Sequence, residues 1–272
     1  MNEIFFETPD FNLKATLESG QVFGFRSHPS GEFQGRVRGW DLKLFQEGDA
    51  LRITAPSGFK KSVLIDYFDL KRDLSPVYRL IEADPLLRPA AKKIKGLRLI
   101  RQDSWEALAC FIISSNNNVK RIQGIWKKLS ELSHDKKSFP TPREIARLHE
   151  RSLREAGLGY RAPFLLHTAQ FVSANPQTLD VIRGAEYTDA LKRVISFPGI
   201  GPKVADCVLL YGFQKYEAFP VDVWILRVMR KLYFRGRSVS EDKIRRFGRK
   251  RWGNLAGYVQ QYLFHSARTK IL

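Results

Sequence analysis

The stretch from Phe197 to Cys207 constrains the fold of this chain more than any other feature. It reads F-P-G-I-G-P-K-V-A-D-C, between an amphipathic segment at 188–196 and an apolar segment at 202–213. Two helices joined by a turn that contains Gly199 and Gly201 would form a helix–hairpin–helix. Glycine allows positive φ and lets the backbone approach a partner closely. The first N–H groups of the second helix would then offer a binding site for phosphate.

Lys203 falls in the first turn of the predicted second helix. The positive end of the helix dipole and apolar neighbours such as Val204 disfavour an ammonium ion there and favour the neutral, nucleophilic amine. The position therefore predicts either a catalytic lysine or a lysine that contacts phosphate. Asp222 lies in P-V-D-V-W-I-L-R, where the next helix should begin. It predicts either an ordinary N-cap or a carboxylate that shares a pocket with Lys203.

The charge balance narrows the class of partner. Lys and Arg together number 46 and Asp and Glu 28, which gives a net charge of +18 and a pI near 10.0. Such an excess favours a polyanionic partner, with nucleic acid the leading interpretation. A ribosome-associated factor or a membrane-surface binder stays open on charge alone. With 43% hydrophobic residues among 272, the composition is that of a globular protein with a sizeable core.

The two cysteines, Cys110 and Cys207, exclude a four-thiolate iron–sulfur cluster and a cysteine-rich zinc site within this sequence. They favour a reducing compartment. No apolar run approaches the length of a membrane span, and the first residues, M-N-E-I-F-F-E-T-P-D-F, do not resemble a signal peptide. We therefore expect an intracellular, non-secreted protein.

The pattern of apolar residues changes from strands to helices along the chain. Residues 40–45 and 51–53 alternate around a turn at 47–49, which predicts a hairpin, and glycines in 11–37 suit short strands and turns. From about residue 75 the pattern is helical. Capping boxes are predicted at Asp103–Glu106 and Thr141–Glu144, and Ser240 should cap a last helical region that runs through Phe264. The prediction is an α+β fold, with an N-terminal antiparallel β-sheet domain at 1–98 and an all-α helix–hairpin–helix domain at 99–272.

Four further stretches join the hairpin in one recognisable set: S-G-Q-V-F at 19–23, S-S-N-N-N at 114–118, G-L-G-Y-R at 157–161 and A-G-Y-V-Q at 256–260, continuing to Phe264. With G-I-G-P-K and the later V-D, the chain resembles the helix–hairpin–helix (HhH-GPD) DNA glycosylase superfamily. Within it, the chain is similar to the 8-oxoguanine DNA glycosylases. The matching residues span nearly the whole sequence.

The resemblance implies a base-excision-repair enzyme that acts on duplex DNA as a monomer. Such an enzyme removes 8-oxoguanine opposite cytosine and has a lyase activity. The base must first leave the stack. Lys203 would then attack C1′ and form a Schiff base, β-elimination would nick the strand, and Asp222 would stabilise positive charge on the sugar. No cofactor is implied, although members of the family often bind a structural cation through hairpin carbonyls.

The resemblance also assigns recognition residues, matched one by one. For the damaged base, the carbonyl of Gly20 would accept from N7–H, Gln260 would read the Watson–Crick edge, and Phe264 and Cys207 would cover the two ring faces. Around the orphan cytosine, Asn116 would fill the gap left by the base, Arg121 and Arg161 would donate to cytosine, and Tyr160 would replace lost stacking. Gly199 and Gly201 would contact the DNA backbone.

Some positions depart from the family pattern. Trp224 stands where many relatives have a histidine, Tyr211 replaces an apolar pocket residue, and Gly24–Phe25 replaces Arg–Trp. These differences suggest a divergent, bacterial subgroup. Three alternatives stay open: a glycosylase for oxidised pyrimidines, one for alkylated bases, and a DNA-binding module without catalysis. The first usually carries four clustered cysteines, and the second usually lacks the catalytic lysine. The enzyme would reside in the cytoplasm and nucleoid of a bacterium or in the nucleus of a eukaryote.

Overall fold

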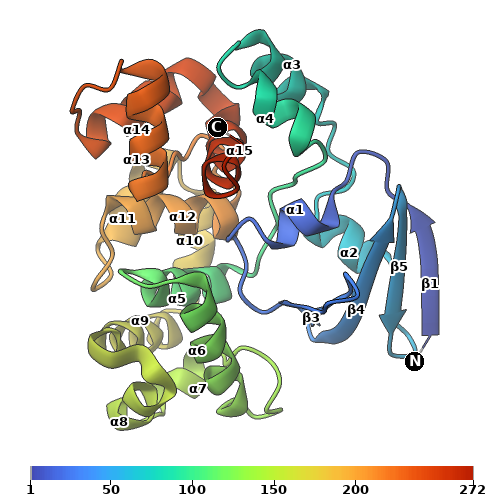
Figure 1. The fold of residues 1–272 in the computed structure, drawn as a ribbon. Helices are drawn as coiled ribbons and strands as arrows, with labels where there is room; N and C mark the ends of the chain where they lie inside the picture. Colours follow the sequence, from blue (N-terminus) through green and yellow to red (C-terminus); the bar gives the residue numbers. More distant parts are fainter. Residues whose placement is uncertain (1, 272) are drawn as a thin grey trace. The chain divides into compact units, whose positions relative to one another are not determined.

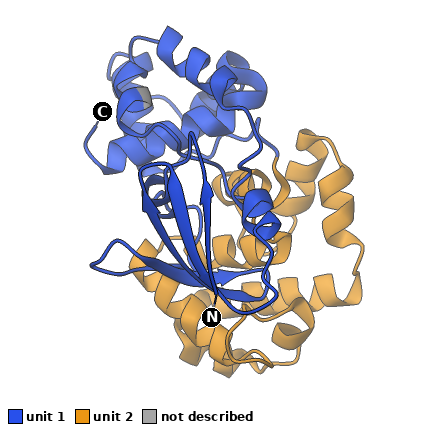
Figure 2. Cartoon of the chain, turned by 90° about the vertical axis from the view of Figure 1, so that its right-hand side faces the viewer, with its two compact units in different colours: residues 1–101, 215–272 blue, residues 102–214 orange. Residues whose placement is uncertain are grey.

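The computed structural model describes residues 2–271 and divides the chain into two compact units (Figure 2). Unit 1 combines residues 1–101 with residues 215–272, and unit 2 comprises residues 102–214. The chain therefore leaves unit 1, builds unit 2 and returns. The predicted domains 1–98 and 99–272 are segments of sequence rather than compact units, and that division stays a prediction.

A five-stranded antiparallel sheet forms the N-terminal part of unit 1, with the strand order β1-β5-β4-β3-β2 (Figure 1). Its strands are β1 (Asn2–Glu7), β2 (Arg26–Ser27), β3 (Phe33–Val37), β4 (Trp40–Glu47) and β5 (Ala50–Ala55). The predicted hairpin is confirmed, because Leu44 pairs with Ile53 and Glu47 pairs with Ala50 across the turn. Both Leu44 and Ile53 are fully buried in the core beneath the sheet.

Two features of this part differ from the expectation. The edge strand β1 was not anticipated, because its exposed and half-covered side chains give little alternation; Phe5, for example, is 61% exposed. Helices also begin well before residue 75, at α1 (Leu13–Leu17) and α2 (Ser62–Tyr67). The side chain of Asn12 caps α1 by accepting from the N–H of Ala15, so the segment 11–37 is not made of strands and turns alone.

The helices of unit 1 come from both of its chain segments. They are α3 (Ser75–Ala83), α4 (Arg88–Lys93), α13 (Val223–Tyr233), α14 (Glu241–Trp252), the 3₁₀ turn η3 (Gly253–Leu255) and α15 (Ala256–Arg268). Ser240 caps α14 as predicted, by accepting from the N–H of Lys243. The predicted helical region through Phe264 is confirmed, and Gly253, with φ 52°, divides it into α14 and α15.

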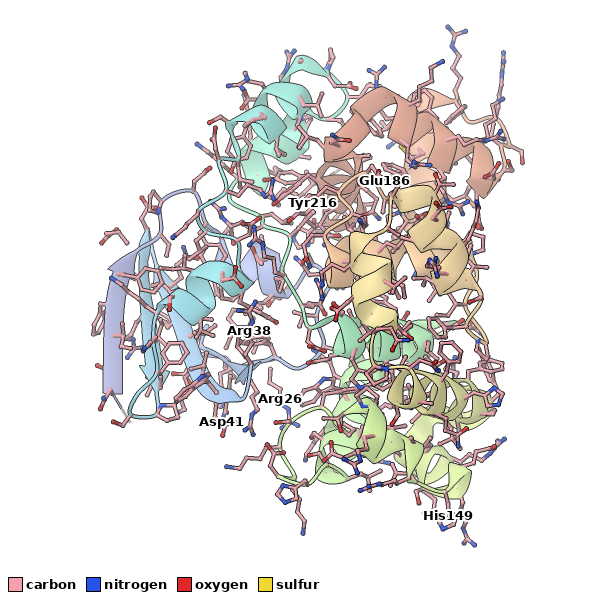
Figure 3. The ribbon with its side chains drawn as sticks, turned by 180° about the vertical axis from the view of Figure 1, so that it is seen from behind. Arg26, Arg38, Asp41, His149, Glu186 and Tyr216 are labelled. Atoms are coloured by element: carbon pink, nitrogen blue, oxygen red, sulfur yellow. The ribbon has the colours of Figure 1, made fainter. Side chains whose placement is uncertain are left out.

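A buried polar network around Asp69 joins these segments within unit 1. Its carboxylate accepts from Arg72 Nε at 2.5 Å and from Arg101 Nη2 at 2.7 Å. The hydroxyl of Tyr216, labelled in Figure 3, lies 3.4 Å from the same carboxylate, and the Tyr216 carbonyl accepts from Gly257 N–H at 2.7 Å. The network therefore fixes where α15 begins relative to the segment that follows the sheet.

Unit 2 is entirely helical in its described residues. Its elements are α5 (Ser104–Ser114), α6 (Val119–Glu131), α7 (Pro142–Ala146), α8 (Glu150–Leu153), η1 (Arg154–Leu158), η2 (Gly159–Arg161), α9 (Ala162–Ala174), α10 (Thr178–Gly184), α11 (Tyr187–Ile195) and α12 (Pro202–Phe213). The α+β prediction is thus confirmed. None of the helices in residues 2–271 is long and apolar enough to cross a membrane.

Of the two capping boxes predicted in unit 2, one is complete and the other has only its first hydrogen bond. Thr141 and Glu144 form the reciprocal pair at α7. At α5 the side chain of Asp103 caps the N–H of Glu106, but Glu106 does not reach back. Its Oε1 instead accepts from the indole N–H of Trp126 on α6 at 2.7 Å. A contact with a residue twenty positions away replaced the local one, and the local pattern alone does not reveal this.

Candidate active site and nucleic-acid interface

The predicted helix–hairpin–helix is present in unit 2 as α11, a turn at 196–201 and α12. Gly199 has φ +75°, and a Cβ atom there would overlap the ring of Phe164 on α9, so both backbone and packing require glycine. Gly201 differs from the expectation, because its φ of −90° suits any residue. A Cβ atom at Gly201 would meet nothing within 4 Å, so this position leaves open space next to the backbone.

The start of α12 carries Lys203 in its first turn, as predicted. Gly201 is the N-cap and supplies no side chain, so no side-chain hydrogen bond caps this helix. Lys203 is half-buried, and Cys207 lies one turn further along the same face and is buried. The Tyr187 hydroxyl donates to Oδ1 of the buried Asp206 at 2.5 Å, which ties α11 to α12. The hairpin is therefore held rigidly from within.

The S-S-N-N-N stretch forms the connection between α5 and α6. Asn116 adopts φ 49°, a left-handed conformation that asparagine tolerates better than most residues. Asn117 Nδ2 donates to the carbonyl of Ile113, and Asn118 caps α6 by accepting from the N–H of Arg121. The three asparagines thus do not lie inside a helix; they end one helix, turn the chain and begin the next.

Arg161 holds this connection from the neighbouring G-L-G-Y-R stretch. It is 3% exposed, and its guanidinium donates to the carbonyls of Ser115 and Asn116. Tyr160 is 51% exposed, and the Arg161 guanidinium lies 4.2 Å from the centre of its ring. Arg121 Nη2 reaches the carbonyl of Gly157 at 3.4 Å. The structure therefore gathers all four residues predicted for the orphan base in one place.

The loop that carries Gly20 is fixed in unit 1 by two buried glutamines that sequence reasoning did not select. Gln21 Nε2 donates to the carbonyls of Thr16 and Arg98, and its Oε1 accepts from the N–H of Ile100. Gln261 Nε2 donates to the carbonyl of Ser19 at 3.0 Å. Because both amide side chains bond to the main chain, the backbone of Gly20 is held in one position.

Phe264 and an unpredicted residue, Arg268, pack directly against Gly20. A Cβ atom built on Gly20, which has φ +76°, would lie 3.1 Å from Arg268 Nη1 and 3.3 Å from Phe264 Cε1. The Arg268 guanidinium lies 5.4 Å from the centre of the Phe264 ring and donates to the Glu18 carbonyl at 3.3 Å. The signal for Arg268 was its position one helical turn after Phe264 on α15.

His265 follows Phe264 and is buried. Burial and the nearby charge of Arg268 both lower the pKa of His265 below its usual value. The imidazole of His265 is therefore neutral at neutral pH. The positive charge near Phe264 on α15 is that of Arg268.

Gln260 and Asp222 are linked through Pro220. Gln260 is 3% exposed and donates from Nε2 to the Pro220 carbonyl at 3.0 Å, while its buried Oε1 has no hydrogen-bond partner within residues 2–271. Asp222 is the half-buried N-cap of α13, and its Oδ1 accepts from the N–H groups of Trp224 and Ile225. The cap interpretation of Asp222 is thus confirmed, and its carboxylate stands at the positive end of a helix.

The predicted residues fall into two groups by unit. Unit 2 contains Lys203, Cys207, the two hairpin glycines and the orphan-base residues, whereas unit 1 contains Gly20, Asp222, Gln260 and Phe264. Within unit 1, Gly20 meets Phe264 and Gln260 is anchored close to Asp222. The meeting of Lys203 with Asp222 joins the two units and stays a prediction, as do the roles of all these residues.

Comparison with known proteins matches two family models over almost the whole chain. Residues 3–108 match the N-terminal domain of 8-oxoguanine DNA glycosylase, and residues 109–254 match the HhH-GPD superfamily base excision DNA repair protein. A probable N-glycosylase/DNA lyase of Methanothermobacter thermautotrophicus is 33% identical, over 95% of this chain and 94% of that protein.

Solved structures agree with these matches. The Clostridium acetobutylicum 8-oxoguanine glycosylase/lyase, in complex with double-stranded DNA containing cytosine opposite 8-oxoguanine, has a TM-score of 0.92 and 31% identity, with 99% of each chain covered. The structure of MBOgg1 with a low-affinity DNA ligand has a TM-score of 0.93 and 32% identity, covering 99% of this chain and 96% of that one. This chain therefore belongs to the HhH-GPD superfamily of base excision DNA repair proteins and carries the N-terminal domain of the 8-oxoguanine DNA glycosylases.

Proposed function

We propose that this protein is a base-excision-repair DNA glycosylase and AP lyase that removes 8-oxoguanine opposite cytosine from duplex DNA. The observation that carries the proposal is Lys203 in the uncapped first turn of α12, directly after the hairpin, in a chain of this family. A helix start without a side-chain cap leaves N–H groups for a DNA phosphate. The amine of Lys203, in the same turn, would then lie beside the strand that those groups bind.

The substrate proposal is supported by the geometry of unit 1. Gly20 has no side chain that would cover its own carbonyl, and Phe264 and Arg268 pack against it. The buried Oε1 of Gln260 is an acceptor without a partner in the described part of the chain, and such a group gains a full hydrogen bond from a donor on the Watson–Crick edge of a purine. Oxidation at C8 turns guanine N7 into a donor, which a backbone carbonyl at Gly20 would accept.

The chemistry needs only groups of the chain and water. The amine of Lys203 bonds to C1′ as the C1′–N9 bond breaks, and the proton that the attacking nitrogen loses passes to the departing base. The C1′–O4′ bond of the sugar ring then breaks, water protonates O4′, and the nitrogen lone pair completes a protonated C1′=N Schiff base. Loss of a C2′ proton expels the 3′ phosphate by β-elimination, and water hydrolyses the imine to return Lys203.

Asp222 would act by its negative charge. An ionised carboxylate close to the sugar stabilises the positive charge that develops at C1′ while the base departs. The N–H groups of Trp224 and Ile225 donate to this carboxylate and fix its position at the N-terminus of α13.

The proposal includes no cofactor, and the working form would be a monomer in the compartment that holds the genomic DNA. The hairpin at 196–201 offers backbone carbonyl oxygens, which are suitable ligands for a hard cation. A structural cation there stays a prediction, and no step passes through it.

The test is borohydride trapping on duplexes that contain 8-oxoguanine opposite cytosine, 8-oxoguanine opposite adenine, thymine glycol or 3-methyladenine. We expect a covalent adduct, base release and nicking, with 8-oxoguanine opposite cytosine the best substrate. Lys203→Gln should abolish the adduct and keep DNA binding, while Lys192→Gln, on the exposed face of α11, should leave both intact. An adduct formed by Lys203→Gln would overturn the mechanism, and a preference for another lesion would overturn the substrate.

A further inference from the structure

The segment 235–251 concentrates positive charge that the proposed site does not use. It covers nearly all of the α13–α14 connection and nearly all of α14. It holds eight basic and two acidic residues, so its net charge of +6 is a third of the +18 carried by the whole chain. Like charges packed this densely repel one another, which favours a partner that neutralises them.

The packing of α14 within unit 1 decides which of its faces is turned outward. Ile244, Gly248 and Trp252 are buried, and a Cβ atom on Gly248 would lie 2.7 Å from the ring of Phe219. Arg251 is held by an ion pair of 2.9 Å with the buried carboxylate of Asp84. Burial raises the pKa of Asp84, but the hydrogen bonds from Arg251 and Tyr233 outweigh that effect and leave the pKa below its usual value. These contacts hold one face of α14 against the rest of unit 1. The opposite face of the helix therefore points to solvent.

The outward face of α14 carries a cationic stripe, which we define as Lys243, Arg246 and Lys250. All three are exposed. Their spacing of three and four residues places them in one row along the helix, about 10 Å long at 1.5 Å per residue. Arg246 pairs with Asp242 at 2.8 Å, but that pair is open to solvent and easily exchanged. Lys243 and Lys250 make no ion pair with any described residue.

The side chains that accompany the stripe decide which polyanion it fits. The large apolar side chains that are exposed in the described chain lie elsewhere, and none falls in 235–251. A helix that binds a membrane surface needs an apolar face for the acyl chains, and a single-strand binder needs exposed aromatic rings for stacking. The backbone of duplex DNA needs only cations on a firm support.

We propose that the cationic stripe on α14 is an additional binding surface for the phosphate backbone of duplex DNA, independent of sequence and of damage. The stripe increases the residence of the enzyme on undamaged DNA while lesions are searched for. This inference rests on the proposed function in one respect, because both assume that the protein acts on duplex DNA. The stripe does not take part in excision.

The test compares the triple variant Lys243→Gln, Arg246→Gln and Lys250→Gln with the intact protein on an undamaged duplex over a range of salt concentrations. Gln has nearly the helix propensity of Lys and Arg, so α14 should persist. Each lost phosphate contact removes about 0.9 from the slope of log K against log salt concentration. We expect the slope to fall by about 2 to 3 and the affinity at low salt to fall at least tenfold.

The matched control is Lys60→Gln, Lys61→Gln and Lys71→Gln, three exposed lysines of unit 1 outside the stripe. It makes the same change in net charge, and we expect it to shift the slope by less than one. Equal effects of the two triple variants would show that total charge, and not the stripe, attracts DNA. An unchanged slope in the stripe variant, or equal loss of binding to vesicles of anionic lipid, would overturn the proposal.

A second measurement separates this inference from the proposed function. Single-turnover excision with enzyme in saturating excess should proceed at the same rate in the stripe variant, because the stripe does not touch the reacting atoms. A lower rate under saturation would place these residues in the active site and overturn the proposal. If the intact protein excises no lesion but the slope still falls in the variant, the proposed function fails and the stripe stands.

Discussion

Arg161 Nη2 donates a hydrogen bond of 2.8 Å to the backbone carbonyl of Asn116. The same guanidinium bonds the carbonyl of Ser115, so one buried cation spans the turn that presents Asn116. Contact with an orphan cytosine would require Arg161 to share or exchange these bonds. The residue therefore serves as a support for the turn before DNA arrives.

Replacing Arg161 by Lys should separate this support from direct recognition. Lysine keeps the charge but lacks the planar fork that reaches two carbonyls. We expect Arg161→Lys to cost about 1 to 2 kcal/mol in the free energy of unfolding, measured in urea, and to weaken the preference for cytosine. Arg121→Lys is the control, because Arg121 has one long bond of 3.4 Å to the Gly157 carbonyl and should keep normal stability. Equal stabilities of the two variants would contradict the supporting role.

Gln260 should matter for the base and not for the sugar. Gln260→Leu removes the unpartnered acceptor and leaves the Pro220 carbonyl without its donor. We expect kcat/KM for 8-oxoguanine excision to fall about 10- to 100-fold, the range for a lost hydrogen bond in an enclosed site. Nicking of a duplex that already holds an abasic site should change less than threefold. Equal losses on both substrates would mean that Gln260 acts on the fold rather than on the base.

Arg268 should orient Phe264 at the Gly20 loop. Arg268→Met keeps an apolar stem of similar length but removes the guanidinium that covers the ring and bonds the Glu18 carbonyl. We expect KM for 8-oxoguanine DNA to rise several-fold with a smaller change in kcat. Since the charge of Arg268 helps to lower the pKa of His265, that pKa should rise in the variant, as an NMR titration would show. An unmoved His265 titration would contradict this placement.

Glu106 should make stability depend on pH. Burial raises the pKa of Glu106 to about 7, although the indole N–H of Trp126 opposes the shift. A raised pKa means that the contribution to stability is complete below the unfolded pKa of 4.5 and is lost as the pH rises through 7. Gln keeps the acceptor for Trp126, so Glu106→Gln should be more stable than the intact protein at pH 8, by about 3 kcal/mol. The two should unfold alike at pH 4, and a constant difference across pH would exclude this titration.

Local patterns predicted the elements whose causes are local. The caps at Thr141 and Ser240 and the bounds of α12 follow from neighbours within four residues, and the structure confirms them. Glu106 accepts a hydrogen bond from Trp126, twenty residues away, instead of completing the capping box of its own helix. Strand β1 forms because it pairs with the edge of β5. Such outcomes depend on which segments meet, and periodicity carries no information about that.

The same distinction applies to the candidate site. The residue types at Lys203, Gln260 and Phe264 could be selected from sequence because each belongs to a contiguous recognisable stretch. Gln21 and Gln261 lie in two of the same stretches but were not selected, because they act by bonding main chain far away in sequence. A polar side chain that hydrogen-bonds to distant main chain gives no recognisable sequence pattern, since an amide at many positions could make the same bond.

The return of the chain to unit 1 after residue 214 has a consequence for biosynthesis. The Ser19 carbonyl accepts a hydrogen bond from Gln261, which follows 242 positions later in the sequence. The Asp84 carboxylate accepts one from Arg251, which follows 167 positions later. On the ribosome the N-terminal segment of unit 1 must therefore remain without these partners while the whole of unit 2 is made. A chain interrupted between α12 and α15 would contain Lys203 but lack Gln260 and Phe264, the residues proposed to contact the damaged base.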